Sequence, residues 1–181
     1  EQPDPNRFLS ITAPYTGNYD IVIVRIDTNA TTPLLELFTY DQELTEYYTP
    51  ASSILVPADV ADALAVGAFQ HNLAFMVEPF SSQGPALDGR LKPDLVGPDG
   101  VSSVTYGNYG APNSGFWGTS AACPHAAGAA ALLWSVHSYL DNAGVASRMR
   151  AEAQDIEPPP GPDNIAGYGR LQLGSVVTPT F

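Results

Sequence analysis

The chain has 181 residues and a formal net charge of −12, with 44 % hydrophobic and only 14 % charged residues. This composition supplies enough apolar material for a folded core and too little charge for a disordered chain. The length favours one domain, or one domain with a small second module. Lys92 is the only lysine and the arginines are scattered, so the sequence offers no basic surface for nucleic acid.

The first fifty residues are predicted to form β-strands. Residues 7–13 alternate apolar and polar side chains with period two, and residues 34–40 are a further candidate strand. Residues 19–27 carry five β-branched side chains and predict a strand buried on both faces. Because turn-like sequences separate these runs, we expect residues 1–50 to form a small antiparallel module resembling a β-sandwich.

Residues 51–181 have the pattern of an α/β fold. Short apolar runs at 53–56 and 63–68 are typical of buried parallel strands. Residues 126–140 are rich in Ala and Leu and predict a helix. After a break with capping residues, a second helix is predicted from about residue 144 to residue 154, where a proline-rich segment ends it.

No membrane span, leader segment or cysteine pair is visible in the sequence. The longest apolar run, residues 126–134, is nine residues long, whereas a bilayer requires roughly 20. The chain begins at Glu1 without a basic or apolar leader, so we expect it to be a piece of a longer protein. Cys123 is the only cysteine, which excludes an internal disulfide and a cysteine zinc site.

The residues that indicate catalytic chemistry lie between 118 and 128, a segment that reads GTSAACPHAAG. Ser120 stands where a glycine-rich loop becomes an Ala-rich helix. The unpaired N–H groups and the positive dipole end of a helix start favour developing negative charge. That environment suits a nucleophile attacking a carbonyl, because the oxyanion forms beside the same N–H groups. A serine at this place is more often a plain helix cap, and the residues alone leave both interpretations open.

Three neighbours of Ser120 are predicted to have structural roles. His125 follows Ser120 by about 500° around a helix axis, so it should point away and not serve as the base. Pro124 fits near the first turn, where a missing N–H costs little. Cys123 is expected to be a small buried packing residue, and the small residues around it should let the helix approach its neighbours closely.

The pattern Gly118-Thr119-Ser120-x-x-x-Pro124-His125-x-x-Gly128 resembles the nucleophile motif of the subtilisin-like serine proteases, the subtilases. Three further blocks, at residues 56–68, 81–98 and 164–169, are similar to this family's blocks and occur in its order. The resemblance covers roughly residues 52–175. It implies that residues 51–181 form the C-terminal part of a subtilisin-like parallel-sheet domain, preceded by residues 1–50 as a β-rich insertion.

By this resemblance Ser120 is the catalytic nucleophile, and its own N–H forms half of the oxyanion hole. Pro124 and His125 are structural members of the motif. Subtilases order their triad Asp, His, Ser, so the other two members and the oxyanion asparagine are expected upstream of this chain. The fragment should therefore be inactive alone. Three residues stand at the wrong positions of the pattern to replace them: His71, Asn108 and His137.

The resemblance implies a secreted or extracytoplasmic serine endopeptidase that hydrolyses proteins or peptides through an acyl-enzyme. The expected partners, besides substrate, are the missing N-terminal part of the same enzyme or further copies of this chain, with no nucleic acid and no membrane span. The family also allows calcium, although no run of alternating Asp/Asn ligands stands out. Two alternatives stay open: a pseudoprotease, and a module that binds protein or cell wall.

Overall fold

The structure is a computed structural model that describes residues 10–24, 26, 35, 37–39, 44–73, 76–110, 114–156 and 159–174. The chain divides into two compact units, residues 1–43 and residues 44–181. The predicted boundary between residues 50 and 51 stays a prediction.

The described residues of the first unit form neither strand nor helix. The Tyr19 hydroxyl turns back to Tyr15, donating to its carbonyl oxygen (2.6 Å) and accepting from its N–H (3.1 Å). Residues 21–24 are exposed, which corrects the expectation of a strand buried on both faces. β-Branched residues form strands where neighbours pair and pack with them, and no such neighbour occurs among the described residues of this unit. Much of the predicted 34–40 strand and the start of the 7–13 strand lie outside the described residues.

A parallel pair of strands forms the centre of the second unit. β1 (Val66–Gln70) and β2 (Leu95–Asp99) pair from Val66 opposite Leu95 to Gln70 opposite Asp99. On the other edge of β2, the Val96 N–H donates to the Gly169 carbonyl (3.0 Å) and Val96 accepts from the Leu171 N–H (2.8 Å). The apolar run at 63–68 therefore correctly predicted a parallel strand.

The apolar run at 53–56 is not a strand. Its backbone contacts with residues 83–84 are two hydrogen bonds, Ser52 N–H to Gly84 (3.0 Å) and Ser53 N–H to Gln83 (2.9 Å). Pro57 follows directly, and a proline has no N–H to continue a ladder. Residues 52 and 53 are thus bound to residues 84 and 83 without widening the sheet.

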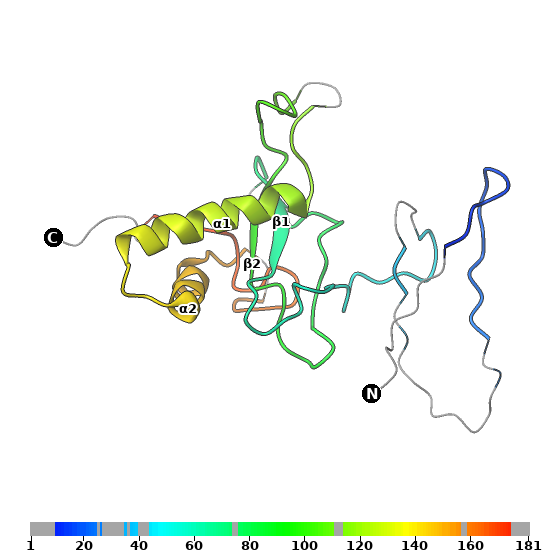
Figure 1. The fold of residues 1–181 in the computed structure, drawn as a ribbon, viewed down its shortest axis with the longest axis horizontal. Helices are drawn as coiled ribbons and strands as arrows, with labels where there is room; N and C mark the ends of the chain where they lie inside the picture. The colour runs from blue at the N-terminus through cyan, green and yellow to red at the C-terminus, as the bar shows by residue number, and fades with distance from the viewer. Residues whose placement is uncertain are drawn as a thin grey trace. The chain divides into compact units, whose positions relative to one another are not determined.

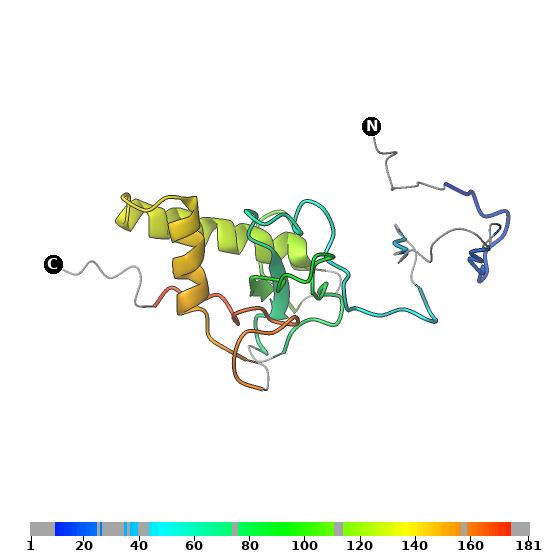
Figure 2. The same ribbon diagram turned by 90° about the horizontal axis from the view of Figure 1, so that it is seen from below.

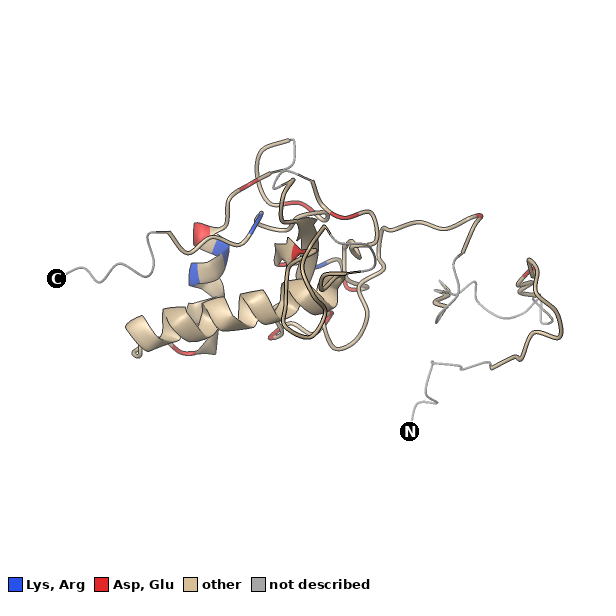
Figure 3. Ribbon diagram, turned by 90° about the horizontal axis from the view of Figure 1, so that it is seen from above, with Lys and Arg blue, Asp and Glu red and all other residues tan. Residues whose placement is uncertain are grey.

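α1 (Thr119–Val136) packs on the strand pair, and α2 (Asn142–Glu152) packs against α1 (Figures 1 and 2). α1 begins earlier and ends earlier than the predicted 126–140, and it lies against both strands. α2 is capped by the Asp141 carboxylate, which accepts from the Gly144 N–H at 2.7 Å. α1 has no charged residue (Figure 3), and no helix in the described ranges is long and apolar enough to cross a membrane.

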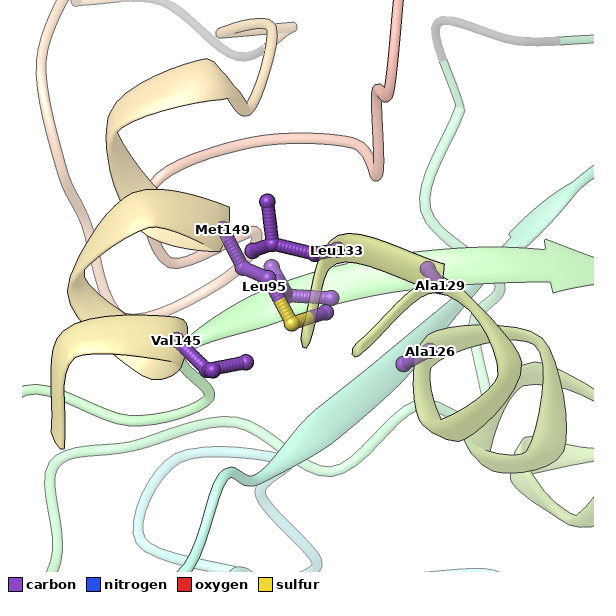
Figure 4. Packing of buried hydrophobic residues seen from close by; sticks show 6 residues of the cluster. All are labelled: Leu95, Ala126, Ala129, Leu133, Val145 and Met149. Atoms are coloured by element: carbon purple, nitrogen blue, oxygen red, sulfur yellow. The ribbon is translucent and has the colours of Figure 1, made fainter. Parts of the chain in front are cut away.

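The core lies where α1 and α2 meet β2. It contains one leucine from the strand, three residues from α1 and two from α2, all buried: Leu95, Ala126, Ala129, Leu133, Val145 and Met149 (Figure 4). Full burial of a side chain such as Leu or Met contributes about 1.5–3 kcal/mol. Gly97 brings α1 and β2 together, because a Cβ there would stand only 2.6 Å from the Ala122 carbonyl oxygen. The expectation of a close helix contact is thus met on this face of α1.

Candidate active site

Ser120 is the second residue of α1, and its side chain is exposed. The helix starts after Gly118, whose φ is +97°, and no side chain caps it. The N–H groups of Ala121 and Ala122 turn back to the Gly118 carbonyl (2.8 and 3.3 Å), whereas the preceding N–H groups have no acceptor within the helix. Ser120 is therefore not a plain helix cap. Its hydroxyl stands beside donor groups that can stabilise negative charge.

All three histidines make other contacts. His125 lies one turn after Ser120, and its Nδ1–H donates to the Ala121 carbonyl at 2.7 Å. His71 directs Nδ1 to the Asp99 carbonyl at 3.0 Å and places its ring against the edge of Tyr109. His137 follows the last turn of α1, roughly 25 Å from Ser120 by the helical rise.

Cys123 is exposed, which corrects the expectation of a buried packing residue. The face of α1 toward the strands carries Ala122 and Ala126, and each helical residue advances about 100°, so Cys123 points outward. Gly128 also borders open space, since a Cβ there would meet nothing within 4 Å. The small residues of α1 thus fall on two faces, one packed and one open.

Aromatic residues build the loop that leads to Ser120. The Tyr109 ring lies 4.3 Å from the His71 ring and 5.6 Å from the Trp117 ring, between ring centres. The Tyr109 hydroxyl accepts from the side-chain amide of Asn72 at 2.7 Å. Asn108 is exposed and uses its backbone carbonyl, which accepts from the Ser114 hydroxyl at 2.8 Å.

Two carboxyl groups with buried oxygens, Asp99 and Glu78, were not singled out by the sequence analysis. Asp99 ends β2 and is 0 % exposed, and neither of its carboxylate oxygens has a full hydrogen bond among the described residues. Burial raises its pKa, while the nearby N–H groups of Gly100 and Gly118 and the charge of His71 oppose the rise. Glu78 also has a buried unpartnered oxygen, and burial and the charge of Asp99 raise its pKa.

Asp94 joins several of the blocks that carry the family resemblance. Its carboxylate accepts from the Ala65 N–H (2.7 Å), Lys92 (2.8 Å) and Arg150 of α2 (2.6 Å). Its carbonyl accepts from the Tyr168 N–H at 2.9 Å. The start of β1, the segment before β2, α2 and the C-terminal turn therefore converge on one residue, the first three on its side chain and the last on its backbone.

The described side chains of His, Cys, Asp and Glu form no donor set for calcium. Within the described ranges, no three side chains among His, Cys, Asp and Glu come together to hold a metal ion. Ca²⁺ takes six to eight oxygen ligands in proteins. Calcium binding therefore stays a prediction, and no step of the chemistry below passes through a metal.

The comparison with protein families identifies the class. The family model described as "Subtilase family" matches residues 16–169, so the chain belongs to the subtilase family. The match begins at residue 16 and thus includes most of the segment that we expected to be an insertion. Residues 1–50 as an inserted module stay a prediction.

Individual relatives agree with this family. The chain is 41 % identical over 105 residues to subtilisin of Bacillus pumilus, covering 56 % of this chain and 34 % of that protein. It is 40 % identical over 105 residues to subtilisin E of Bacillus subtilis (strain 168), covering 56 % of this chain and 24 % of that protein. The chain therefore spans about a third or less of the length of these relatives.

Two solved structures resemble the fold. The CspB protease of Clostridium perfringens matches with a TM-score of 0.56 and 24 % identity, over 68 % of this chain and 28 % of that one. The prenylagaramide maturation protease PagA matches with a TM-score of 0.54 and 26 % identity, over 71 % of this chain and 46 % of that one. Together with the parallel strands and the packed helices, they establish the subtilisin-like α/β fold of the matched part.

Proposed function

We propose that this chain is the nucleophile-bearing part of a subtilisin-type serine endopeptidase and that Ser120 is its nucleophile. The observation that carries the proposal is the exposed Ser120 hydroxyl at the start of α1, inside the family motif and beside helix N–H groups without an intrahelical acceptor. We further propose that the substrates are proteins or peptides and that the enzyme is secreted or extracytoplasmic, and membership of the subtilase family supports both proposals.

The Ser120 hydroxyl attacks the substrate carbonyl, and the new oxyanion accepts from the Ser120 N–H. A base must remove the hydroxyl proton, and neither His71 nor His125 is directed to it. We place the triad histidine and aspartate, and the oxyanion asparagine, in other parts of the enzyme. The helix dipole alone contributes about 0.3–1 kcal/mol at an exposed end, less than the 1.36 kcal/mol needed for tenfold in rate.

The remaining part of the enzyme, or a second copy of this chain, is the proposed partner. α1 also carries exposed apolar side chains on either side of its packed face, Leu132 at 55 % and Trp134 at 48 % exposure. A subtilisin-like sheet is covered on both faces, so these apolar groups fit a surface that another part of the protein covers.

A fluorophosphonate probe tests the assignment of Ser120. In the longer protease that contains this chain, the probe should label Ser120, and Ser120→Ala should remove both labelling and peptide hydrolysis. For enzymes of this type, loss of the serine alone lowers turnover by about 10⁶. Ser102→Ala is the matched control, because Ser102 is also an exposed loop serine, and it should leave labelling intact.

The 181-residue chain alone should stay unlabelled, since general-base catalysis supplies about 10²–10⁴ in rate. Stoichiometric labelling of the chain alone within minutes would place a base inside it. A longer protein that folds but is never labelled would favour the pseudoprotease instead.

A further inference from the structure

Contacts among three aromatic rings connect the end of β1 with the loop that leads into α1. His71 directly follows β1, and its ring stands edge-on to the Tyr109 ring, with 4.3 Å between ring centres. The Tyr109 ring in turn lies 5.6 Å from the Trp117 ring. Because the three residues are not neighbours in the sequence, the fold brings them together, and Tyr109 takes part in both contacts.

Tyr109 is held through its backbone, its hydroxyl and its ring. Its N–H donates to the Ser102 hydroxyl (2.9 Å), and its own hydroxyl accepts from the side-chain amide of Asn72 (2.7 Å). His71, against which the ring stands, donates its backbone N–H (3.1 Å) and its Nδ1–H (3.0 Å) to the Asp99 carbonyl at the end of β2. The place of the Tyr109 ring is therefore fixed relative to the ends of both strands.

The Trp117 ring lies on the residue that follows β2. A Cβ atom at Gly100 would stand 2.8 Å from this ring, so the ring occupies the space that a side chain at Gly100 would take. The indole N–H donates to the Ser114 carbonyl at 3.2 Å. The preceding residue, Phe116, exchanges two backbone hydrogen bonds with Val101 (2.7 and 3.1 Å). Trp117 is still 44 % exposed, so its ring is not enclosed and depends on these lateral contacts for a fixed orientation.

The turn between Trp117 and Ser120 transmits this orientation to the helix. Gly118 has a φ of +97°, which glycine adopts without strain, and it has no side chain to hold the turn. On the helix side, the Gly118 carbonyl accepts from the N–H groups of Ala121 and Ala122 (2.8 and 3.3 Å). On the other side, the turn continues directly into Trp117. Movement of Trp117 is therefore passed to the first turn of α1, which carries Ser120.

We propose that Tyr109 is a positioning residue for Ser120: its ring restrains the Trp117 ring and thereby fixes the turn from which α1 begins. Aromatic rings at about this separation prefer defined tilted or edge-on arrangements, so the contact specifies an orientation as well as a distance. The consequence for catalysis rests on the function proposed for Ser120, whereas the contact between the two rings does not.

Time-resolved fluorescence anisotropy measures the restraint on Trp117 in the 181-residue chain. In a Trp134→Phe background Trp117 is the only tryptophan, and Tyr109→Ala should increase the fast local part of its depolarisation. Tyr109→Phe retains the ring and should behave like the parent chain. Tyr139→Ala is the matched control, because Tyr139 also contacts a histidine ring but lies beyond α1 and is 80 % exposed. Equal local depolarisation in Tyr109→Ala and the parent chain would overturn the proposal.

A measurement on the unaltered chain remains decisive if Tyr109→Ala fails to fold. Nuclear Overhauser effects should connect the ring protons of Tyr109 with the indole protons of Trp117 and with the imidazole protons of His71. A folded chain without the effects between Tyr109 and Trp117 would overturn the contact.

Fluorophosphonate labelling of the longer protease measures the catalytic consequence. The probe is small, so its rate of reaction with Ser120 reports the placement of the hydroxyl. Tyr109→Ala should slow labelling about tenfold to a hundredfold, because a misplacement of about 1 Å can cost on the order of 10² in rate. Tyr109→Phe should restore most of the rate, and Tyr139→Ala should leave it unchanged.

Peptide hydrolysis by the same variants separates positioning from substrate binding. The loss in Tyr109→Ala should appear in kcat. A rise in KM alone, with unchanged labelling, would assign Tyr109 to substrate binding and overturn the positioning role. If the wild-type protease is not labelled while Tyr109 restrains Trp117 as expected, the proposed function fails and the contact between the rings stands.

Discussion

At the scale of single residues, the buried acids of this chain oppose its stability at neutral pH. The pKa of Asp99 and the pKa of Glu78 are both raised, mainly by burial, so between the ordinary and the raised pKa the folded chain binds more protons than the unfolded chain. Stability therefore falls as the pH rises through this window, and the full penalty is present above it. Such a cost is typical of residues kept for function.

Asp99→Asn should raise the free energy of unfolding at neutral pH, because it removes the cost of ionising a carboxyl that burial disfavours in the charged form. The difference from the wild-type chain should narrow as the pH falls through the raised pKa of Asp99. Urea unfolding at several pH values measures it. If the free energies of unfolding of wild type and variant changed with pH in parallel, Asp99 would not be the group that causes the pH dependence.

At the scale of the elements, Asp94 joins four segments, three through its carboxylate and one through its backbone carbonyl. Its side chain is 5 % exposed and its partner Lys92 is 3 % exposed, while Arg150 approaches from α2. Ala65 and Tyr168 reach the same residue through their backbones. Removal of this carboxylate leaves Lys92 as a buried charge without its counter-ion.

Asp94→Asn should lower the free energy of unfolding by about 3–5 kcal/mol, the cost of breaking a buried ion pair on one side. Asp88→Asn is the control, because the Asp88–Arg90 pair is largely exposed and such pairs contribute little. Thermal unfolding measures the melting temperatures of both variants, and only Asp94→Asn should melt well below wild type. Equal melting temperatures for Asp94→Asn and wild type would contradict the role of Asp94.

The sequence predicted those elements whose own residues carry a strand or helix pattern. The apolar run around Ala65 marked β1, and the Ala-rich segment after Ser120 marked α1. β2 has a glycine and a proline among its five residues, so it carries no strand signal of its own and forms because β1 pairs with it. The motif around Ser120 located the candidate nucleophile, whereas Asp99 and Glu78 become noticeable only when folding buries them together.

At the scale of the whole molecule, the association state of the chain depends on what covers α1. One face of this helix packs on the strands, and Leu132 and Trp134 are exposed on the two sides of that face. We expect the 181-residue chain to self-associate in the absence of the remaining enzyme, because burial of exposed apolar side chains favours association. Light scattering should give a mass above the 19.1 kDa of one chain.

The double change Leu132→Ser and Trp134→Ser should move this mass toward that of the monomer without loss of helical circular dichroism. Arg148→Ser, on the exposed side of α2, is the control and should leave association unchanged. A monodisperse monomer of the wild-type chain at high concentration would contradict the expectation.

The outward position of Cys123 has a practical consequence. It is the only thiol in the chain, and it stands three residues after Ser120, where helical side chains are neighbours. Its alkylation rate therefore measures how open the beginning of α1 is, without any need for hydrolysis. A molecule that binds over Ser120, whether an inhibitor, a propeptide or the rest of the enzyme, should slow the alkylation of Cys123 in proportion to its occupancy. Binding at this site can thus be followed even in a chain that cleaves nothing.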